Sequence, residues 1–157
     1  MSLHIEAGGG LRPQRGFTLV ELMAALVIVG LIAGIGSVGY VRTLEEARYT
    51  QAVTDLTSIA QELRAYEIAT RDLPSSLSEL GVDLTDPWGH PYEYSNFDDI
   101  PKGKRRKDKF LTPLNSDFDL FSAGPDGGYQ APLTAKASQD DVIYAGDGAY
   151  IGPADEF

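Results

Sequence analysis

Cysteine is absent from this chain of 157 residues, and histidine occurs only twice, at His4 and His90. Disulfides, thiolate metal sites and cysteine nucleophiles are therefore excluded, and little remains for a histidine-based site. No G-x-S-x-G sequence offers a serine nucleophile, and nothing fixes two acids at the separation that sugar cleavage needs. We therefore expect a protein that is not an enzyme; a membrane-tethered periplasmic enzyme is the alternative from another class.

Basic residues are also scarce, because 13 Lys and Arg stand against 23 Asp and Glu, a formal net charge of −10. Binding to a phosphate backbone needs concentrated Lys and Arg, so nucleic acid is not an expected partner. An acidic chain leaves room for binding a hard cation. The length and the 43% hydrophobic content suit one ordinary globular domain.

The N-terminal region changes character abruptly at Phe17. Residues 1–16 are polar and glycine-rich and carry Arg12 and Arg15, whereas residues 17–41 contain one charge, Glu21. About 20 apolar residues are enough to cross a bilayer, and a signal-peptide core usually has only about 7–15. We expect a single membrane-spanning helix over 17–41. The basic leader places the N-terminus in the cytoplasm and the remainder outside.

The expected helix continues beyond the membrane as an amphipathic segment, from Arg42 to about Arg71. Apolar side chains recur on one face with the helical period, at Leu44, Ala52, Leu56, Ile59, Ala60, Leu63 and Tyr66. The sequence Asp72-Leu73-Pro74 ends the helix. Residues 42–157 are therefore expected to form one globular domain that includes the second half of the helix.

Short elements joined by turns follow Pro74. One or two helical turns over 76–80 stop at Gly81, and short strands are expected at 92–94, 118–121, 142–144 and 149–151. No alternation of strands and helices is present, so the sheet should be small and antiparallel. The predicted fold class is α+β, with a long N-terminal transmembrane-plus-amphipathic helix packed on a small antiparallel sheet.

The sequence Arg15-Gly16-Phe17-Thr18-Leu19-Val20-Glu21 resembles the processing site of type IV prepilins and type II secretion pseudopilins. In these families a prepilin peptidase cuts after the glycine and methylates the new N-terminus. The resemblance implies removal of the leader 1–16, cleavage between Gly16 and Phe17, and N-methylation of Phe17.

Glu21 would lie inside the hydrocarbon, where a charge costs roughly 2.5–3.5 kcal/mol or more. Such a residue is tolerated when it has a partner. The natural partner in a filament is the α-amine of a neighbouring subunit's Phe17, which would neutralise both charges and set the axial register. The alternative is a side chain that extends to the membrane interface.

The C-terminal half narrows the resemblance to the major pseudopilin (GspG-type) of type II secretion systems. Residues 86–94 are similar to a D-P-W-G-x-P-Y-x-Y stretch of that family, residues 118–127 to F/Y-D-L-x-S-x-G-x-D-G, and residues 138–143 to an acidic strand start. This resemblance implies the pilin fold. It also implies a structural subunit that assembles with copies of itself and other pseudopilins, on an inner-membrane platform, into a periplasmic filament that drives protein secretion. A type IV pilus major or minor pilin is the alternative.

In that subfamily the same loops hold one Ca²⁺, an ion that takes six to eight oxygen ligands. The resemblance implies Asp126, Asp140 and Asp141 as ligands, with a backbone carbonyl near Ala123 completing the shell. The spacing is not that of an EF-hand, and the insertion 129–137 separates the two halves of the site. Solvated acidic turns are the alternative.

Three further features have both a structural and a functional interpretation. Trp88, the only tryptophan, is expected to be a packing anchor rather than a ligand platform. The basic run 102–109 is expected to be a solvated loop, with an interaction loop for acidic surfaces of adjacent subunits or cargo as the alternative. His90 has no evident companion, and no chemistry is assigned to it.

Overall fold

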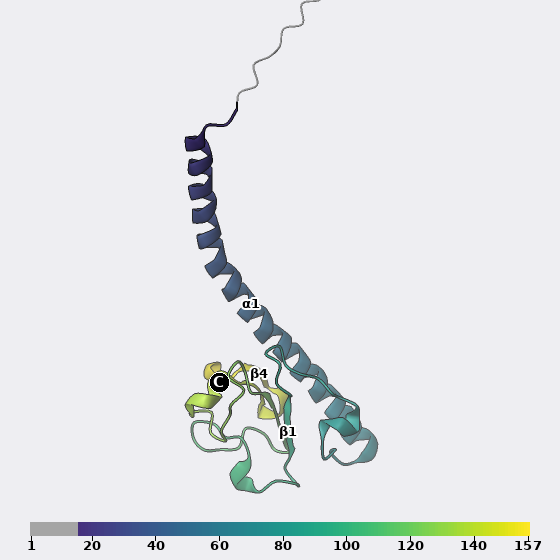
Figure 1. Cartoon of the computed structure of the whole chain (residues 1–157). Coiled ribbons are helices and arrows are strands. Elements are labelled where there is room, and N and C mark those ends of the chain that lie inside the picture. The colour runs from purple at the N-terminus through teal and green to yellow at the C-terminus, as the bar shows by residue number, and fades with distance from the viewer. Residues whose placement is uncertain (1–15) are drawn as a thin grey trace, which may run out of the picture. The chain divides into compact units, whose positions relative to one another are not determined.

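The computed structural model describes residues 16–157, although for residues 35–39 it describes the backbone alone. The predicted leader, apart from Gly16, lies outside the described residues. The chain divides into two compact units, residues 1–41 and 42–157, and each is described by itself. Helix α1 (Leu19–Thr70) contributes to both units (Figure 1).

The first unit contains the start of α1, which has a capping motif. The Glu21 backbone N–H donates a hydrogen bond to Thr18 Oγ1 (3.2 Å), and the Glu21 and Leu22 N–H groups also reach the Thr18 carbonyl. Thr followed three residues later by Glu is a capping box. The capping geometry explains why the helix begins at Leu19, two residues beyond Phe17.

The described residues from Gly16 to Gly34 are all exposed, and the large apolar side chains among them are 55–78% exposed. In the described part of the chain, none of the helices is long and apolar enough to cross a membrane. The spanning segment expected over 17–41 includes residues 35–39, whose side chains lie outside the described ones, and it stays a prediction.

The second unit begins with the amphipathic part of α1. Five of its predicted core positions are buried against the sheet, namely Ala52, Leu56, Ile59, Ala60 and Leu63. Leu44 was expected on the same face, but it is 41% exposed. It lies about two turns before the first buried position, so the packed face is shorter than the periodicity predicts.

The sheet is a four-stranded antiparallel meander in the order β1-β2-β3-β4. Its strands are β1 (Glu93–Asn96), β2 (Phe118–Ser122), β3 (Val142–Ala145) and β4 (Tyr150–Pro153). All four predicted strands are therefore confirmed, within about two residues at their ends. The α+β prediction of a long helix on a small antiparallel sheet is confirmed as well.

Both faces of the central strands β2 and β3 are covered. Side chains on one face pack against α1, for example Phe118 and Val142, and those on the other face pack against loops, for example Phe121 and Ile143. Successive strand residues point to opposite faces, and both faces are covered. Every residue of both strands is therefore buried.

Short 3₁₀ turns connect these elements, at η1 (Leu77–Leu80), η2 (Lys102–Lys104), η3 (Lys136–Ser138), η4 (Gly146–Gly148) and η5 (Ala154–Glu156). The turn predicted over 76–80 is confirmed as η1. Gly81 ends it with φ of 72°, a left-handed conformation that glycine adopts without strain.

Candidate functional site

The expected cleavage point is open to an enzyme. A side chain at Gly16 would meet nothing within 4 Å, and Phe17 is 78% exposed. Regular structure begins only at Leu19. Glu21 lies in the first helical turn, where the helix dipole favours a carboxylate. The structure thus places Gly16, Phe17 and Glu21 together on an exposed segment.

The 86–94 motif is organised by a buried carboxylate. Asp86 Oδ1 accepts hydrogen bonds from the backbone N–H groups of Trp88 (3.0 Å) and His90 (2.8 Å). Its Oδ2 accepts a hydrogen bond from Ser122 Oγ (2.5 Å). Asp86 therefore shapes its own turn and links that turn to β2, a role that the sequence alone did not indicate.

His90 has companions, so the expectation that it stands alone is wrong. Its Nδ1 lies 3.0 Å from the Gly124 carbonyl oxygen, and a Cβ at Gly127 would lie 2.7 Å from its Nε2. Ser122 hydrogen-bonds Asp86 rather than His90, so no nucleophile–base pair forms between them. The imidazole instead joins the 86–94 turn to the 123–127 loop.

Trp88 is a packing anchor, as predicted. Its ring meets Tyr49 of α1 edge to face at 5.0 Å, and its Nε1–H donates to Glu45 (3.3 Å). Tyr92 also contacts α1, because its hydroxyl donates a hydrogen bond to Asp55 (2.8 Å). The family motif thus holds the loops against the helix.

Asp126 and Asp140, two of the three carboxylates predicted to bind calcium, lie close together. The Asp126 N–H donates to Asp140 Oδ2 (3.3 Å), and Asp126 Oδ1 accepts from the Gly128 N–H (2.7 Å). A Cβ at Gly124, whose φ is +64°, would overlap the Asp140 carbonyl, so only glycine permits this approach of the two loops. Both aspartates line an open hollow of about 1100 Å³.

Asp141, the third predicted ligand, is fully buried and forms an ion pair with Arg106. Burial raises the pKa of Asp141 to about 6, although Arg106 opposes the shift. Ala123 is also buried. Within residues 16–157, no group of three or more acidic or histidine side chains is placed to hold a metal ion. The donor set therefore fits a cation only in part, with Asp126 and Asp140 available and Asp141 engaged elsewhere.

Arg106 departs furthest from the environment that the sequence predicts for it. It belongs to the run expected to be a solvated loop, yet it is 2% exposed. Its guanidinium donates to Asp141 and to the Gln130 carbonyl (2.8 Å), and it lies over the Phe121 ring at 4.3 Å. Arg106 thus anchors the insertion 129–137. The positive charge at this position is supplied by the chain itself.

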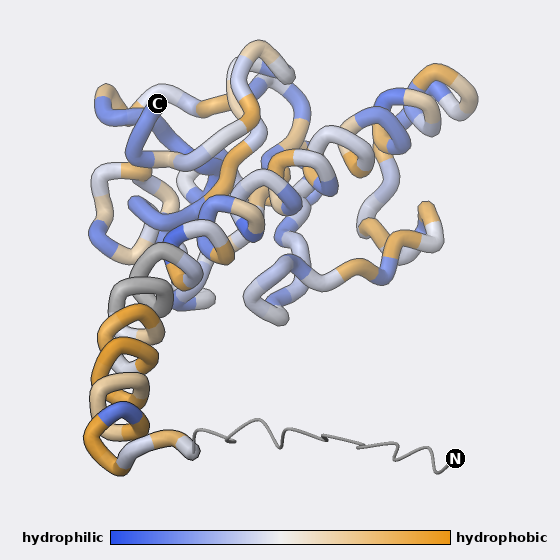
Figure 2. The backbone as a smooth tube through the Cα atoms, turned by 90° about the horizontal axis from the view of Figure 1, so that it is seen from above, coloured by the Kyte–Doolittle hydropathy of each residue, from blue (hydrophilic) through white to orange (hydrophobic). Residues whose placement is uncertain are grey.

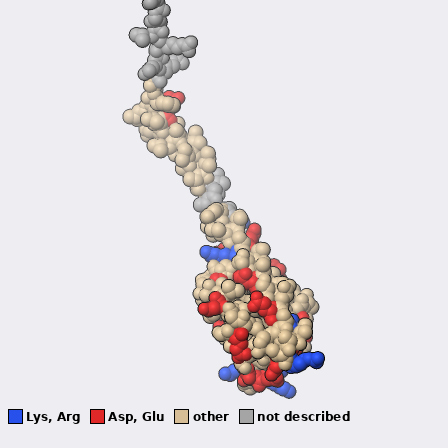
Figure 3. All heavy atoms as spheres, turned by 90° about the vertical axis from the view of Figure 1, so that its right-hand side faces the viewer, with Lys and Arg blue, Asp and Glu red and all other residues tan. Residues whose placement is uncertain are grey.

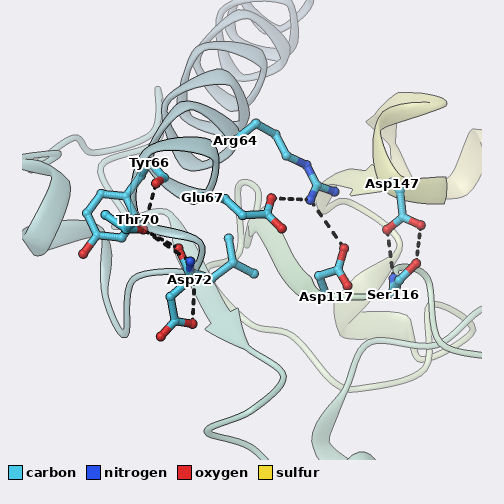
Figure 4. Close-up of polar contacts among 9 residues, drawn as sticks. Arg64, Tyr66, Glu67, Thr70, Asp72, Ser116, Asp117 and Asp147 are labelled. Atoms are coloured by element: carbon cyan, nitrogen blue, oxygen red, sulfur yellow. Dashed lines mark hydrogen bonds and ion pairs between the residues drawn. The ribbon is translucent and has the colours of Figure 1, made fainter.

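A second polar cluster involves α1, the segment before β2 and the turn between β3 and β4 (Figure 4). Arg64 lies between Glu67 (2.9 Å) and Asp117 (3.4 Å). Nearby, Ser116 donates two hydrogen bonds to Asp147, and although burial opposes the shift, these bonds lower the pKa of Asp147. These contacts link α1 to Asp117 and link Ser116 to the turn at Asp147, and they offer no nucleophile.

A long N-terminal helix packed on an antiparallel meander, behind a processing motif, defines the pilin-like class of proteins. The prokaryotic N-terminal methylation motif matches residues 11–37. The chain is 31% identical over 121 residues to type II secretion system core protein G of Pectobacterium carotovorum subsp. carotovorum, which covers 73% of this chain and 78% of the relative.

The proteins of the same name from Pseudomonas aeruginosa and Escherichia coli K12 are 28% and 27% identical. They cover 74% and 73% of this chain, and 87% and 83% of their own lengths. The chain belongs to the type II secretion system core protein G family. No solved structure matches it.

Proposed function

We propose that this chain is a structural subunit of a type II secretion pseudopilus, anchored in the inner membrane and then assembled into a periplasmic filament. The observation that carries the proposal is an exposed apolar helix directly behind a processing motif. Such a helix needs lipid or other apolar helices around it. Membership of the core protein G family supports the same function.

Assembly would bury the exposed side chains of residues 17–34 against neighbouring copies. Fully burying one Leu, Ile, Val or Met side chain stabilises by about 1.5–3 kcal/mol relative to water. Because lipid tails already provide an apolar surrounding, helices in a membrane associate mainly by packing and polar contacts. The Glu21 carboxylate and the α-amine of a neighbour's Phe17 are the polar contact that we propose for register.

Processing by a prepilin peptidase supplies that amine. Cleavage between Gly16 and Phe17 would remove the leader and leave a charged N-terminus two residues before the helix. The exposed position of both residues supports access by the enzyme. The subunit would then pass from an inner-membrane assembly platform into a filament with other pseudopilins.

Calcium binding is part of the same proposal. Asp126, Asp140 and the Ala123 carbonyl are the groups that would hold the ion, with water filling the open side of the hollow. Asp141 would contribute only if it left Arg106. The ion would link the 123–127 loop to the start of β3 and supply positive charge between two carboxylates.

The function is tested in cells that carry the prepilin peptidase and the assembly platform. The precursor is expected to lose residues 1–16 and gain a methyl group at Phe17, as intact mass and N-terminal sequencing would show. Glu21→Gln is expected to be processed normally but to assemble no filament. Gln can still complete the capping box, so this change removes the charge and keeps the helix start.

Glu62→Gln is the matched control, because it neutralises an exposed acid of the same helix and should assemble like the parent. An unprocessed precursor would contradict the proposal. So would surface pili that disappear with this protein while secretion continues, because those would indicate a type IV pilin.

A further inference from the structure

Residues 107–113 form a hairpin-like projection, which we call the finger. Its base is fixed, because the Leu114 N–H donates to the Arg106 carbonyl (3.0 Å) and both of these residues are buried. Backbone hydrogen bonds join Lys107 to Ala131 (2.8 Å) and to Leu133 (2.9 Å). The finger is therefore attached through both backbone groups of Lys107 to the insertion that Arg106 holds in place.

The tip of the finger is held in one conformation. Asp108 Oδ1 accepts from the N–H groups of Phe110 and Thr112, both at 2.8 Å, and the Asp108 N–H donates to the Thr112 carbonyl. Leu111 has a φ of +63°, which is costly for a branched side chain and persists only where neighbouring contacts impose it. The tip is thus preorganised.

This rigid tip presents apolar and basic side chains to solvent. Phe110 is 76% exposed and Leu111 is 66% exposed, and the Lys109 ammonium lies beside the Phe110 ring. Lys102 and Lys104 of the preceding turn are exposed as well. In Figure 3 most of the face in view is tan, Asp and Glu are scattered over it, and Lys and Arg lie at its lower end and at its upper left edge. An exposed aromatic anchor with adjacent charges is typical of a binding surface.

The same unit has a hollow of complementary charge. Its volume is about 1100 Å³, and five carboxylates line it, from Glu46, Asp126, Asp140, Asp155 and Glu156, against one base, Lys136. Tyr49 also lines the hollow, and burial together with the neighbouring carboxylates raises the pKa of its hydroxyl. A convex, basic and apolar tip matches a concave, acidic recess in both shape and charge.

We propose that the finger of one copy docks into the acidic hollow of a neighbouring copy, with Phe110 and Leu111 inserted and Lys109 facing Glu46 and Glu156. The inference rests on the proposed filament function and assigns one of its subunit contacts. A second copy is the favoured occupant, because the same chain carries both the basic, apolar tip and the acidic hollow that complements it. Such a contact joins two different surfaces and so repeats along a filament.

The absence of cysteine makes cross-linking a clean test. Leu111→Cys is combined with Thr50→Cys, an exposed position that lines the hollow. Filaments of the full chain are collected, oxidised and run on a non-reducing gel. The double variant is expected to give a ladder of covalent oligomers, and each single variant is expected to give none beyond a dimer.

Leu111→Cys with Asp98→Cys is the matched control, because Asp98 is exposed but does not line the hollow. This pair should give no ladder. Lys109→Glu in the cross-linking pair is expected to lower the yield of oligomers by about fivefold, and adding Glu46→Lys is expected to restore it.

Filaments that form normally but do not cross-link would overturn the docking and leave the pseudopilus function standing. A failure to form any filament would overturn both. Binding to phosphatidylglycerol vesicles that Phe110→Ala abolishes, without any covalent ladder, would identify the finger as a lipid contact and also overturn the proposal.

Discussion

The two halves of α1 contrast in how they use apolar side chains. Up to residue 34 the helix is almost uniformly apolar, whereas from residue 42 onward polar and apolar turns alternate (Figure 2). The described side chains of the first part are all exposed, and the apolar stripe of the second part is buried to 0–6% exposure at its five core positions. One helix thus contains a segment made for surroundings outside the subunit and a segment satisfied within it.

This contrast predicts where a substitution acts. Changes in the second part and its loops should alter the stability of residues 42–157, because their partners lie in the same unit. Changes in the first part should leave that stability alone and alter assembly instead. The predictions below run from the largest expected effect to the smallest.

The largest effect is expected from Arg106→Ala. Removing one partner of a buried ion pair typically costs about 3–5 kcal/mol, because the other charge is left uncompensated. Here Asp141 would lose its cation, and Gln130 would lose a donor at its carbonyl. Denaturant unfolding of residues 42–157 measures the loss, with Lys104→Ala at an exposed position as the control. A change below about 1 kcal/mol would contradict the buried ion pair.

Leu63→Ala tests the packed half of the helix. Leu63 is fully buried against the sheet, and such truncations cost about 2–5 kcal/mol. Leu26→Ala removes the same atoms from the first part, where Leu26 is 72% exposed. It should leave the unfolding midpoint of the second unit in the full chain unchanged. Equal effects of the two changes would remove the distinction between the two halves.

Much of this contrast could be predicted from the sequence, because periodicity reports which face of an element is buried. The continuous apolar run, the amphipathic stripe and the four strands all follow from that signal. The prediction that Leu44 lies on the buried face was wrong, because the apolar period of a helix does not indicate where the sheet that covers it ends. The packing residue Trp88 was identified from its neighbourhood of Pro and Tyr.

The polar core was less predictable. Arg106 lies in a run of bases whose composition is that of a solvated loop, and only the fold brings it to Asp141, 35 residues away along the chain. The same holds for Asp86 and Ser122, which meet across 36 residues. The one local signal for such contacts was the D-P-W-G motif itself, which indicates a turn but not its buried partner.

Asp119 gives a pH dependence to the second unit alone. Burial raises its pKa from 3.8 to about 6, although the Arg106 N–H and Asn115 oppose the shift. The folded state therefore holds this proton more tightly than the unfolded state. Its contribution to stability is present below about pH 4 and is lost as the pH rises through about 6, by an amount on the order of 3 kcal/mol at most.

Asp119→Asn isolates this group from the other acids. The amide can still accept the hydrogen bond that the Arg106 N–H makes to Asp119 Oδ2 (2.6 Å), and it carries no charge at any pH. The variant should therefore gain stability over the parent at pH 7.5 and match it near pH 4. Urea titrations of both proteins at the two pH values measure the difference. A parent that is relatively more stable at pH 7.5 would show that the carboxylate is not penalised by burial.

The smallest effect is expected from calcium removal. An ion that binds only the folded unit adds stability by mass action, but Arg106 already neutralises Asp141 and holds the insertion without any metal. EGTA should therefore lower the melting temperature of residues 42–157 by only about 2–4 °C, a loss of about 1 kcal/mol or less. Asp126→Ala should remove the difference, and Asp83→Ala, at an exposed acid outside the hollow, should preserve it. Collapse of the fold in EGTA would mean that the internal cation cannot replace the ion, and identical melting with and without EGTA would mean that Asp126 and Asp140 hold none.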